Sequence, residues 1–158
     1  MNIILLSGGS GKRLWPLSND IRSKQFIKLF KDDNGNYESM VQRVYRQITT
    51  VNPMVKVTVA TSKNQVSVIK SQLGEKINIC VEPSRRDTFP AILLAAAYIH
   101  YELGIGVEEC IAVCPVDPYV DNDYYKCVGE LENLVEAGTA NLTLMGIKPT
   151  YPLSLIHI

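Results

Sequence analysis

Short apolar runs alternate with helical periods along this sequence, and this alternation constrains the fold more than any other feature. Five runs are rich in Ile, Val or Leu, which is typical of strands buried on both faces of a sheet: Asn2 to Ser7, Val55 to Thr61, Ile77 to Val81, Cys110 to Cys114 and Asn141 to Ile147. Between them, apolar residues recur at helical spacing in four segments: Ser39 to Val51, Asn64 to Leu73, Thr88 to Leu103 and Asp121 to Ala137. The repeat predicts a doubly wound α/β fold whose ligands bind at the carboxyl ends of the strands.

The helix predicted over Thr88 to Leu103 differs from the others because its segment PAILLAAAY is apolar on nearly all sides. A helix with apolar residues all round is typical of a buried element. We therefore expect this helix to lie between the sheet and another layer. Thr88 is the predicted N-cap residue, and Pro90 is tolerated in the first helical turn.

Length and composition favour a single globular domain, since 158 residues with 46% hydrophobic side chains can fill one sizeable core. Sixteen basic residues balance sixteen acidic ones, which argues against a nucleic-acid-binding arm or a membrane-binding patch. The apolar run at residues 3–6 is too short for a signal sequence, and no apolar stretch approaches membrane-spanning length, so we expect a cytoplasmic location. Four cysteines without metal-ligand spacing are expected to be buried, reduced thiols: Cys80, Cys110, Cys114 and Cys127.

A glycine-rich segment, SGGSGKRLWPLS, follows the first predicted strand. Its glycines allow backbone amides to point toward a bound phosphate. A Walker A loop would need glycine at Leu6 and Ser or Thr at Arg13, and a dinucleotide-binding fingerprint would need its third glycine at Leu14. The segment therefore predicts a phosphate site of a different type. Trp15 and Pro16 are expected to pack and stiffen the end of the loop.

Three further motifs follow in order: SKQF, EPSRRDTFPAILLAAAY and PVDPYV. Together with GGSGKRLWPLS they resemble the sugar-phosphate nucleotidyltransferases over residues 1 to about 152, and the RLWPLS form is most similar to members that use GTP and mannose 1-phosphate. The resemblance implies a Rossmann-like α/β domain, a mostly parallel sheet with helices on both faces. It also implies an enzyme that joins mannose 1-phosphate and GTP, with Mg²⁺, to give GDP-mannose and pyrophosphate.

Transfer of a nucleotidyl group builds negative charge on phosphate oxygens, so its catalyst needs backbone donors, fixed cations and a divalent ion. The resemblance implies that Arg13 and Lys24 are the catalytic cations. The Arg13 guanidinium can donate two hydrogen bonds to phosphate oxygens, and the Lys24 ammonium can act as a point charge. The resemblance also implies contacts to the nucleotide, with the guanine or the ribose near Glu82, Arg85, Arg86 and Thr88. The residues with implied contacts are Leu6, Gly8, Gly9, Ser10, Gly11, Lys12, Glu82, Arg85, Arg86 and Thr88.

Asp117 follows the predicted strand that ends at Cys114, where a carboxylate would meet a phosphate-bound Mg²⁺ ion. Its counterpart in the resembling family binds the metal. Many members place histidine after this aspartate, whereas this chain has Pro118. Asp121 and Asp123 are expected to begin a helix rather than to bind metal.

The resemblance stops at Leu153, and residues 153–158 form a tail, LSLIHI, that departs from the family pattern. A second metal-binding carboxylate and the residues that handle the sugar phosphate have no counterpart, so we expect residues 1–152 to be the N-terminal part of a longer domain and inactive alone. Two alternatives stay open, a nucleotide-binding module without catalysis and, more remotely, an NAD-dependent dehydrogenase. The sequence leaves a homo-oligomer open.

Overall fold

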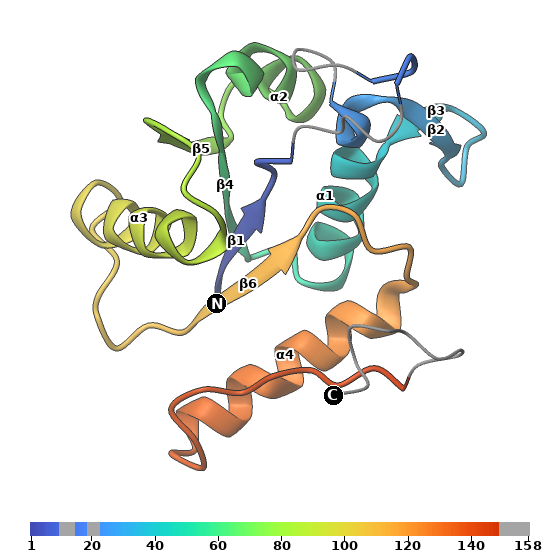
Figure 1. The fold of residues 1–158 in the computed structure, drawn as a ribbon. Helices are drawn as coiled ribbons and strands as arrows, with labels where there is room; N and C mark the ends of the chain where they lie inside the picture. The colour runs from blue at the N-terminus through green and yellow to red at the C-terminus, as the bar shows by residue number, and fades with distance from the viewer. Residues whose placement is uncertain (10–14, 19–22, 149–158) are drawn as a thin grey trace.

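The computed structural model describes residues 1–9, 15–18 and 23–148 of the chain. Its main sheet has four parallel strands in the order β5-β4-β1-β6 (Figure 1). The strands are β1 (Asn2–Leu6), β4 (Lys56–Ser62), β5 (Asn78–Glu82) and β6 (Ile111–Pro115). Each lies within one residue of a predicted strand, so the expected parallel sheet and four of its five strands are confirmed.

Three α-helices connect these strands, a fourth follows β6, and each overlaps a predicted helix: α1 (Met40–Val51), α2 (Val66–Leu73), α3 (Thr88–Tyr101) and α4 (Asn122–Glu136). Two single turns of 3₁₀ helix complete the connections: η2 (Lys24–Phe26) and η3 (Lys63–Gln65). Figure 1 shows α1 and α3 on opposite sides of the sheet. The doubly wound α/β fold is therefore confirmed.

Two cores form because successive side chains of a strand point to opposite faces of the sheet. Ile3 and Leu5 of β1 are buried in the larger core, together with side chains from α1, α2 and α4. Ile4 is buried on the other face, where it belongs to a smaller cluster with Ala95 and Ile99 of α3. Full burial of an aliphatic side chain contributes about 1.5–3 kcal/mol, so this alternation fixes which face of β1 meets which helix.

Side-chain oxygens cap the N-termini of three helices, α1, α3 and α4. Ser39 caps α1 in a reciprocal pair with Gln42, and Asp121 accepts from the first backbone amides of α4, as predicted. The predicted cap of α3 is wrong, because the N-cap residue is Asp87 rather than Thr88. Asp87 has a φ of 71°, and its carboxylate accepts from the Thr88 amide at 2.9 Å. Asp tolerates this backbone region better than most residues because its short side chain hydrogen-bonds locally.

The expected burial of α3 between two layers is wrong within the described residues. Ala91, Ala95 and Ile99 face the sheet and are buried, whereas Phe89 is 72% exposed and Leu93 59% exposed. The apolar composition of the helix indicated a second covering layer, but only one side of the helix, with Ala91, Ala95 and Ile99, is buried against the sheet. Phe89, Leu93, Leu94 and Tyr101 are exposed on its other sides.

A two-stranded antiparallel hairpin, which was not predicted, precedes α1. It consists of β2 (Lys28–Lys31) and β3 (Tyr37–Ser39). Asp32 accepts hydrogen bonds from the amides of Asn34 and Asn36, and Gly35 supplies the positive φ of 82° that the turn requires. The strands are only four and three residues long, β2 is largely exposed, and the two buried residues of β3, Glu38 and Ser39, are polar, so their sequence carries no strong apolar alternation.

The predicted fifth strand, Asn141 to Ile147, is not a strand in the structure. Residues 143–148 have no regular secondary structure, and β6 forms an edge of the sheet. Met145 packs against the larger core, while Leu142, Leu144 and Ile147 are exposed. An apolar run becomes a strand only where its backbone pairs with a neighbouring strand. Residues 142–145 instead line a cavity of about 440 Å³ together with β6 and α4.

No helix in the described part of the chain is long and apolar enough to cross a membrane. All four cysteines are free thiols, as expected, but only Cys80 and Cys114 are buried. Cys127 is exposed on the outer face of α4, so the prediction that every thiol is buried is wrong.

Candidate nucleotide and metal site

The carboxyl ends of the four parallel strands lie at one edge of the sheet, and the order in which the strands are added reverses at β1. From β1 the chain adds β4 and then β5 on one side, and it returns to place β6 on the other side of β1. Helices on both faces leave a crevice at such a switch point, where doubly wound sheets bind their ligands. The segment after β1, beginning at Ser7, and the segment after β6, which carries Asp117, both start at this edge.

Lys24 and Asp117 form an ion pair at this edge, although they are 93 residues apart in the sequence. The Lys24 ammonium lies 2.8 Å from Asp117 Oδ2, and the two side chains are 35% and 46% exposed. We call this pair the charged corner. It brings together one residue predicted to contact phosphate and one predicted to hold a metal ion.

Buried side chains fix the backbone next to Lys24. Gln25 donates from Nε2 to the carbonyl of Ser7 at 2.7 Å and to that of Gly9 at 3.3 Å, so η2 is attached to the start of the glycine-rich segment. Ser23 accepts from Gln65, which itself accepts from Thr61 at the end of β4. These two contacts hold η2 against two different strands.

Two side chains of α1 hold the turn that carries Asp117. Arg43 and Gln47 both donate to the backbone carbonyl of Val120. The Arg43 guanidinium also lies 4.3 Å from the centre of the Tyr119 ring, a cation–π contact that secures the same turn. The backbone of Asp117 is therefore positioned independently of its contact with Lys24.

A second feature at the same edge is a cavity of about 420 Å³ between the end of β1, the end of β5 and the start of α3. We call it the Glu82 cavity. Six of its lining residues are predicted nucleotide contacts, and Asp87 and Ala91 complete it: Leu6, Gly8, Gly9, Glu82, Arg85, Asp87, Thr88 and Ala91. A Cβ atom on Gly8 would lie 3.1 Å from Glu82 Oε1, so glycine permits the close approach of this carboxylate.

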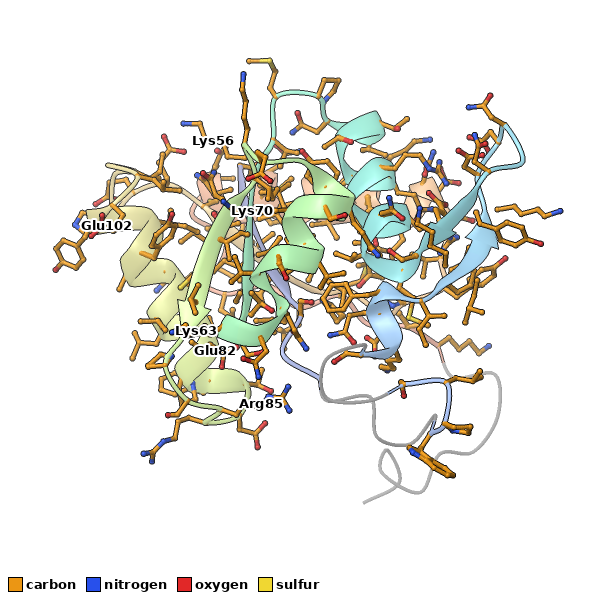
Figure 2. All side chains as sticks on the ribbon, turned by 90° about the horizontal axis from the view of Figure 1, so that it is seen from above. Lys56, Lys63, Lys70, Glu82, Arg85 and Glu102 are labelled. Carbon is orange, nitrogen blue, oxygen red and sulfur yellow. The ribbon has the colours of Figure 1, made fainter. Side chains whose placement is uncertain are left out.

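Burial in the wall of the cavity raises the pKa of the Glu82 carboxyl, and the nearby Arg85 guanidinium partly opposes this effect. Figure 2 shows Glu82 and Arg85 at one end of the molecule, with Lys56 toward the opposite end. The described residues 83–90 that follow Glu82 are all exposed, and Arg86 donates only a long 3.4 Å hydrogen bond to Ser84. The cavity is thus open on this side.

Several predicted site residues lie outside the described residues: Ser10, Gly11, Lys12 and Arg13. Trp15, which was expected to pack at the end of the loop, is 78% exposed, so that interpretation is wrong for the described part of the chain. A large side chain next to proline indicated packing, but most of the Trp15 surface is exposed.

Sequence reasoning missed the residues that support the charged corner. Gln25 and Ser23 flank Lys24 in the SKQF motif, yet only the lysine was singled out, because polar residues in a short turn are usually solvated. Gln65 and Arg43 carry no local signature at all, since their partners lie 42 and 77 residues away.

The donor chemistry of the charged corner fits Mg²⁺. Asp117 offers hard carboxylate oxygens at a half-exposed position, and Oδ2 already accepts from a cation, the Lys24 ammonium. The described residues contain one group of three potential ligands elsewhere, Cys110, Glu132 and Glu136. It lies at the other end of the sheet, where the amino terminus is 3.1 Å from Glu132.

Residues 2–151 match the protein family described as nucleotidyl transferase. The chain is 33% identical over 153 residues to a mannose-1-phosphate guanylyltransferase of Escherichia coli, covering 94% of this chain and 32% of that protein. It is 31% identical over 151 residues to a mannose-1-phosphate guanylyltransferase of Sinorhizobium fredii, covering 94% of this chain and 28% of that one. The chain thus spans about a third of the length of these curated relatives.

Two solved structures share the fold. One, described as a mannose-1-phosphate geranyltransferase from Thermus thermophilus, superimposes with a TM-score of 0.65 at 28% identity over 86% of this chain and 37% of its own. The other, described as a mannose-6-phosphate isomerase from Helicobacter pylori, gives a TM-score of 0.59 at 20% identity over 87% of this chain and 47% of its own. The second likeness concerns the fold alone.

Proposed function

Because the chain belongs to the nucleotidyl transferase family, we propose that it supplies the nucleotide-binding part of an enzyme that joins mannose 1-phosphate and GTP to give GDP-mannose and pyrophosphate. The observation that carries the proposal is the charged corner, where Lys24 and Asp117 lie 2.8 Å apart. A phosphate-binding cation and a metal-binding carboxylate at one strand edge are what phosphoryl chemistry needs. The names of the curated relatives support the choice of substrates.

In this proposal the glycine-rich segment binds the phosphates. Gly8 and Gly9 leave room for the nucleotide, while Arg13 and Lys24 neutralise charge that develops on the α-phosphate and on the departing pyrophosphate. Asp117 would hold Mg²⁺ through its carboxylate oxygens. When bound, the ion supplies a divalent charge that stabilises the phosphate oxygens.

The Glu82 cavity takes the guanine base. The Glu82 carboxylate accepts hydrogen bonds from the guanine N1 and N2 groups, which adenine cannot offer. Its raised pKa supports this role, because a carboxylate that has lost part of its hydration gains more from two donors than a fully solvated one. Ser10, Gly11, Lys12, Arg85 and Thr88 complete the contacts to the nucleotide in this proposal.

We place the activity in the cytoplasm, where nucleoside triphosphates are available and free thiols such as Cys80 and Cys114 stay reduced.

The test is a titration of the 158-residue chain with GTP and with ATP in the presence of Mg²⁺, followed by an assay of pyrophosphate release with mannose 1-phosphate. We expect GTP to bind at least about tenfold more tightly than ATP, since each 1.4 kcal/mol of discrimination corresponds to tenfold. Asp117→Asn should remove the dependence of GTP binding on Mg²⁺ while the melting temperature changes little.

Each outcome decides a different part of the proposal. Formation of GDP-mannose supports the transferase directly, whereas tight GTP binding without turnover supports only the nucleotide site and favours a binding module for the chain alone. Equal affinities for GTP and ATP overturn the assignment of the base. Absence of affinity for either nucleotide in a folded chain overturns the whole proposal.

A further inference from the structure

The charged corner joins two groups to which the proposed function gives different partners. Lys24 is assigned to phosphate and Asp117 to Mg²⁺, yet the two side chains bind each other at 2.8 Å. The ammonium lies on Oδ2 of the carboxylate. A divalent ion that approached the same oxygen would repel the ammonium, so the ion pair and direct ligation of a metal by Oδ2 exclude each other.

The two backbones that carry this pair are fixed by separate contacts. Gln25 attaches η2 to the carbonyls of Ser7 and Gly9, and Arg43 attaches the Asp117 turn to α1. The pair can therefore open by rotation of the Lys24 side chain alone. Both side chains are about a third to a half exposed, so an incoming ion reaches the carboxylate directly from solvent.

An exposed ion pair contributes little to the free energy of unfolding, because the charges are screened and both side chains lose rotational freedom. Structural support is therefore a poor explanation for a lysine held on this carboxylate. The positive charge of Lys24 explains its position on Asp117 better. Without a ligand, Asp117 is neutralised by Lys24; with a metal on Asp117, the lysine is free to meet the negative charge of the nucleotide phosphates.

We propose that Lys24 is a placeholder cation, which occupies Asp117 until a divalent ion displaces it and which the displacement releases toward the nucleotide phosphates. This inference rests on the proposed function of the same site. It predicts that Lys24 has opposite effects in two states. Lys24 competes with the metal when the nucleotide is absent, and it assists metal–nucleotide binding when the nucleotide is present.

The first experiment measures binding of Mn²⁺, as a spectroscopic substitute for Mg²⁺, to the nucleotide-free 158-residue chain by electron paramagnetic resonance. The variant is Lys24→Met. The matched control is Lys28→Met, which removes the same charge from an exposed lysine of β2 four residues away. We expect Lys24→Met to bind Mn²⁺ about two- to fivefold more tightly than Lys28→Met, the range that loss of an exposed ion pair allows. Asp117→Asn in the Lys24→Met background should abolish this gain.

The second experiment repeats the titration in the presence of GTP. Lys24→Met should now weaken binding of the Mn²⁺–GTP complex, whereas Lys28→Met should leave it unchanged. Equal Mn²⁺ affinities of Lys24→Met and Lys28→Met without nucleotide, in chains whose circular dichroism shows a native fold, would overturn the placeholder role. So would Mn²⁺ binding that does not depend on Asp117. The metal titration without nucleotide decides this inference even where failure to bind GTP has already overturned the proposed function.

Discussion

The charged corner and the Glu82 cavity lie at the same edge of the sheet, but they are supported in different ways. Beneath Lys24 and Asp117, buried or half-buried side chains such as Gln25 and Arg43 bond to backbone carbonyls of other elements. Around Glu82, the described residues from Pro83 to Pro90 are exposed, and the side-chain hydrogen bonds that they make within the described part of the chain reach only their near neighbours.

This difference indicates which part of the site is preorganised. Groups that stabilise developing charge act best when they are fixed before the reaction, and the charged corner meets this condition. A base-binding pocket with an exposed wall can adjust to its ligand at little cost, because few contacts oppose its movement. Substitutions beneath the corner should therefore affect stability more than substitutions around the cavity.

The largest effect is expected for Gln25→Leu. The change keeps most of the volume but removes the hydrogen bonds to the carbonyls of Ser7 and Gly9, one of them buried. We expect the free energy of unfolding in urea to fall by about 2–3 kcal/mol, because each carbonyl loses its donor. The comparison change, Arg86→Ala, removes an exposed side chain from the segment next to the cavity and should alter the free energy of unfolding by at most about 0.5 kcal/mol. Equal losses for the two variants would contradict the comparison.

A smaller effect is expected for Arg43→Ala. This variant loses the hydrogen bond to the Val120 carbonyl and the cation–π contact with Tyr119. We expect a loss of about 1–2 kcal/mol in the free energy of unfolding, measured by urea denaturation. Lys31→Ala is the control, because its ammonium lies 5.3 Å from the Tyr37 ring in an exposed hairpin. A loss at Lys31 as large as that at Arg43 would show that burial of the contact is unimportant.

Gly8 and Gly9, which both line the Glu82 cavity, allow a closer comparison within it. Neither has a φ in the left-handed region, so alanine reduces the entropy of the unfolded chain without backbone strain. Gly9→Ala should raise the free energy of unfolding by about 0.4–1 kcal/mol, because its Cβ meets no described atom within 4 Å. Gly8→Ala should raise the free energy of unfolding by less, because the added Cβ must displace the Glu82 carboxylate. Thermal denaturation of both variants measures the difference, and an equal gain would mean that the carboxylate moves freely.

The smallest effect concerns pH. A pKa raised in the folded state means that ionisation of Glu82 costs stability, and this cost grows as the pH rises above about 4.5, the ordinary value. Glu82→Gln removes the cost. The variant should match the wild-type melting temperature near pH 4, where the carboxyl is mostly protonated. It should exceed the wild-type melting temperature slightly near pH 7, where the carboxyl is ionised. A difference that stays constant across this range would show that Glu82 ionises without penalty.

The sequence by itself determined the parallel sheet and its four helices. It also placed Lys24 in the connection that follows the first strand and Asp117 just after the strand that ends near Cys114. These features depend on apolar spacing within a few residues, and such spacing fixes which face of an element is buried regardless of the partner. The strand edge could be predicted for the same reason, since a strand followed by a helix places its next loop at the carboxyl end.

Only the tertiary structure decided which of these elements gain partners. The run at residues 141–147 is as apolar as the true strands, yet it pairs with nothing in the described chain, and the apolar helix α3 stays uncovered on its outer face. Gln25, Gln65 and Arg43 support the charged corner through contacts 16 to 77 residues apart. Such contacts depend on the order of strands in the sheet, and no local pattern of residues encodes that order.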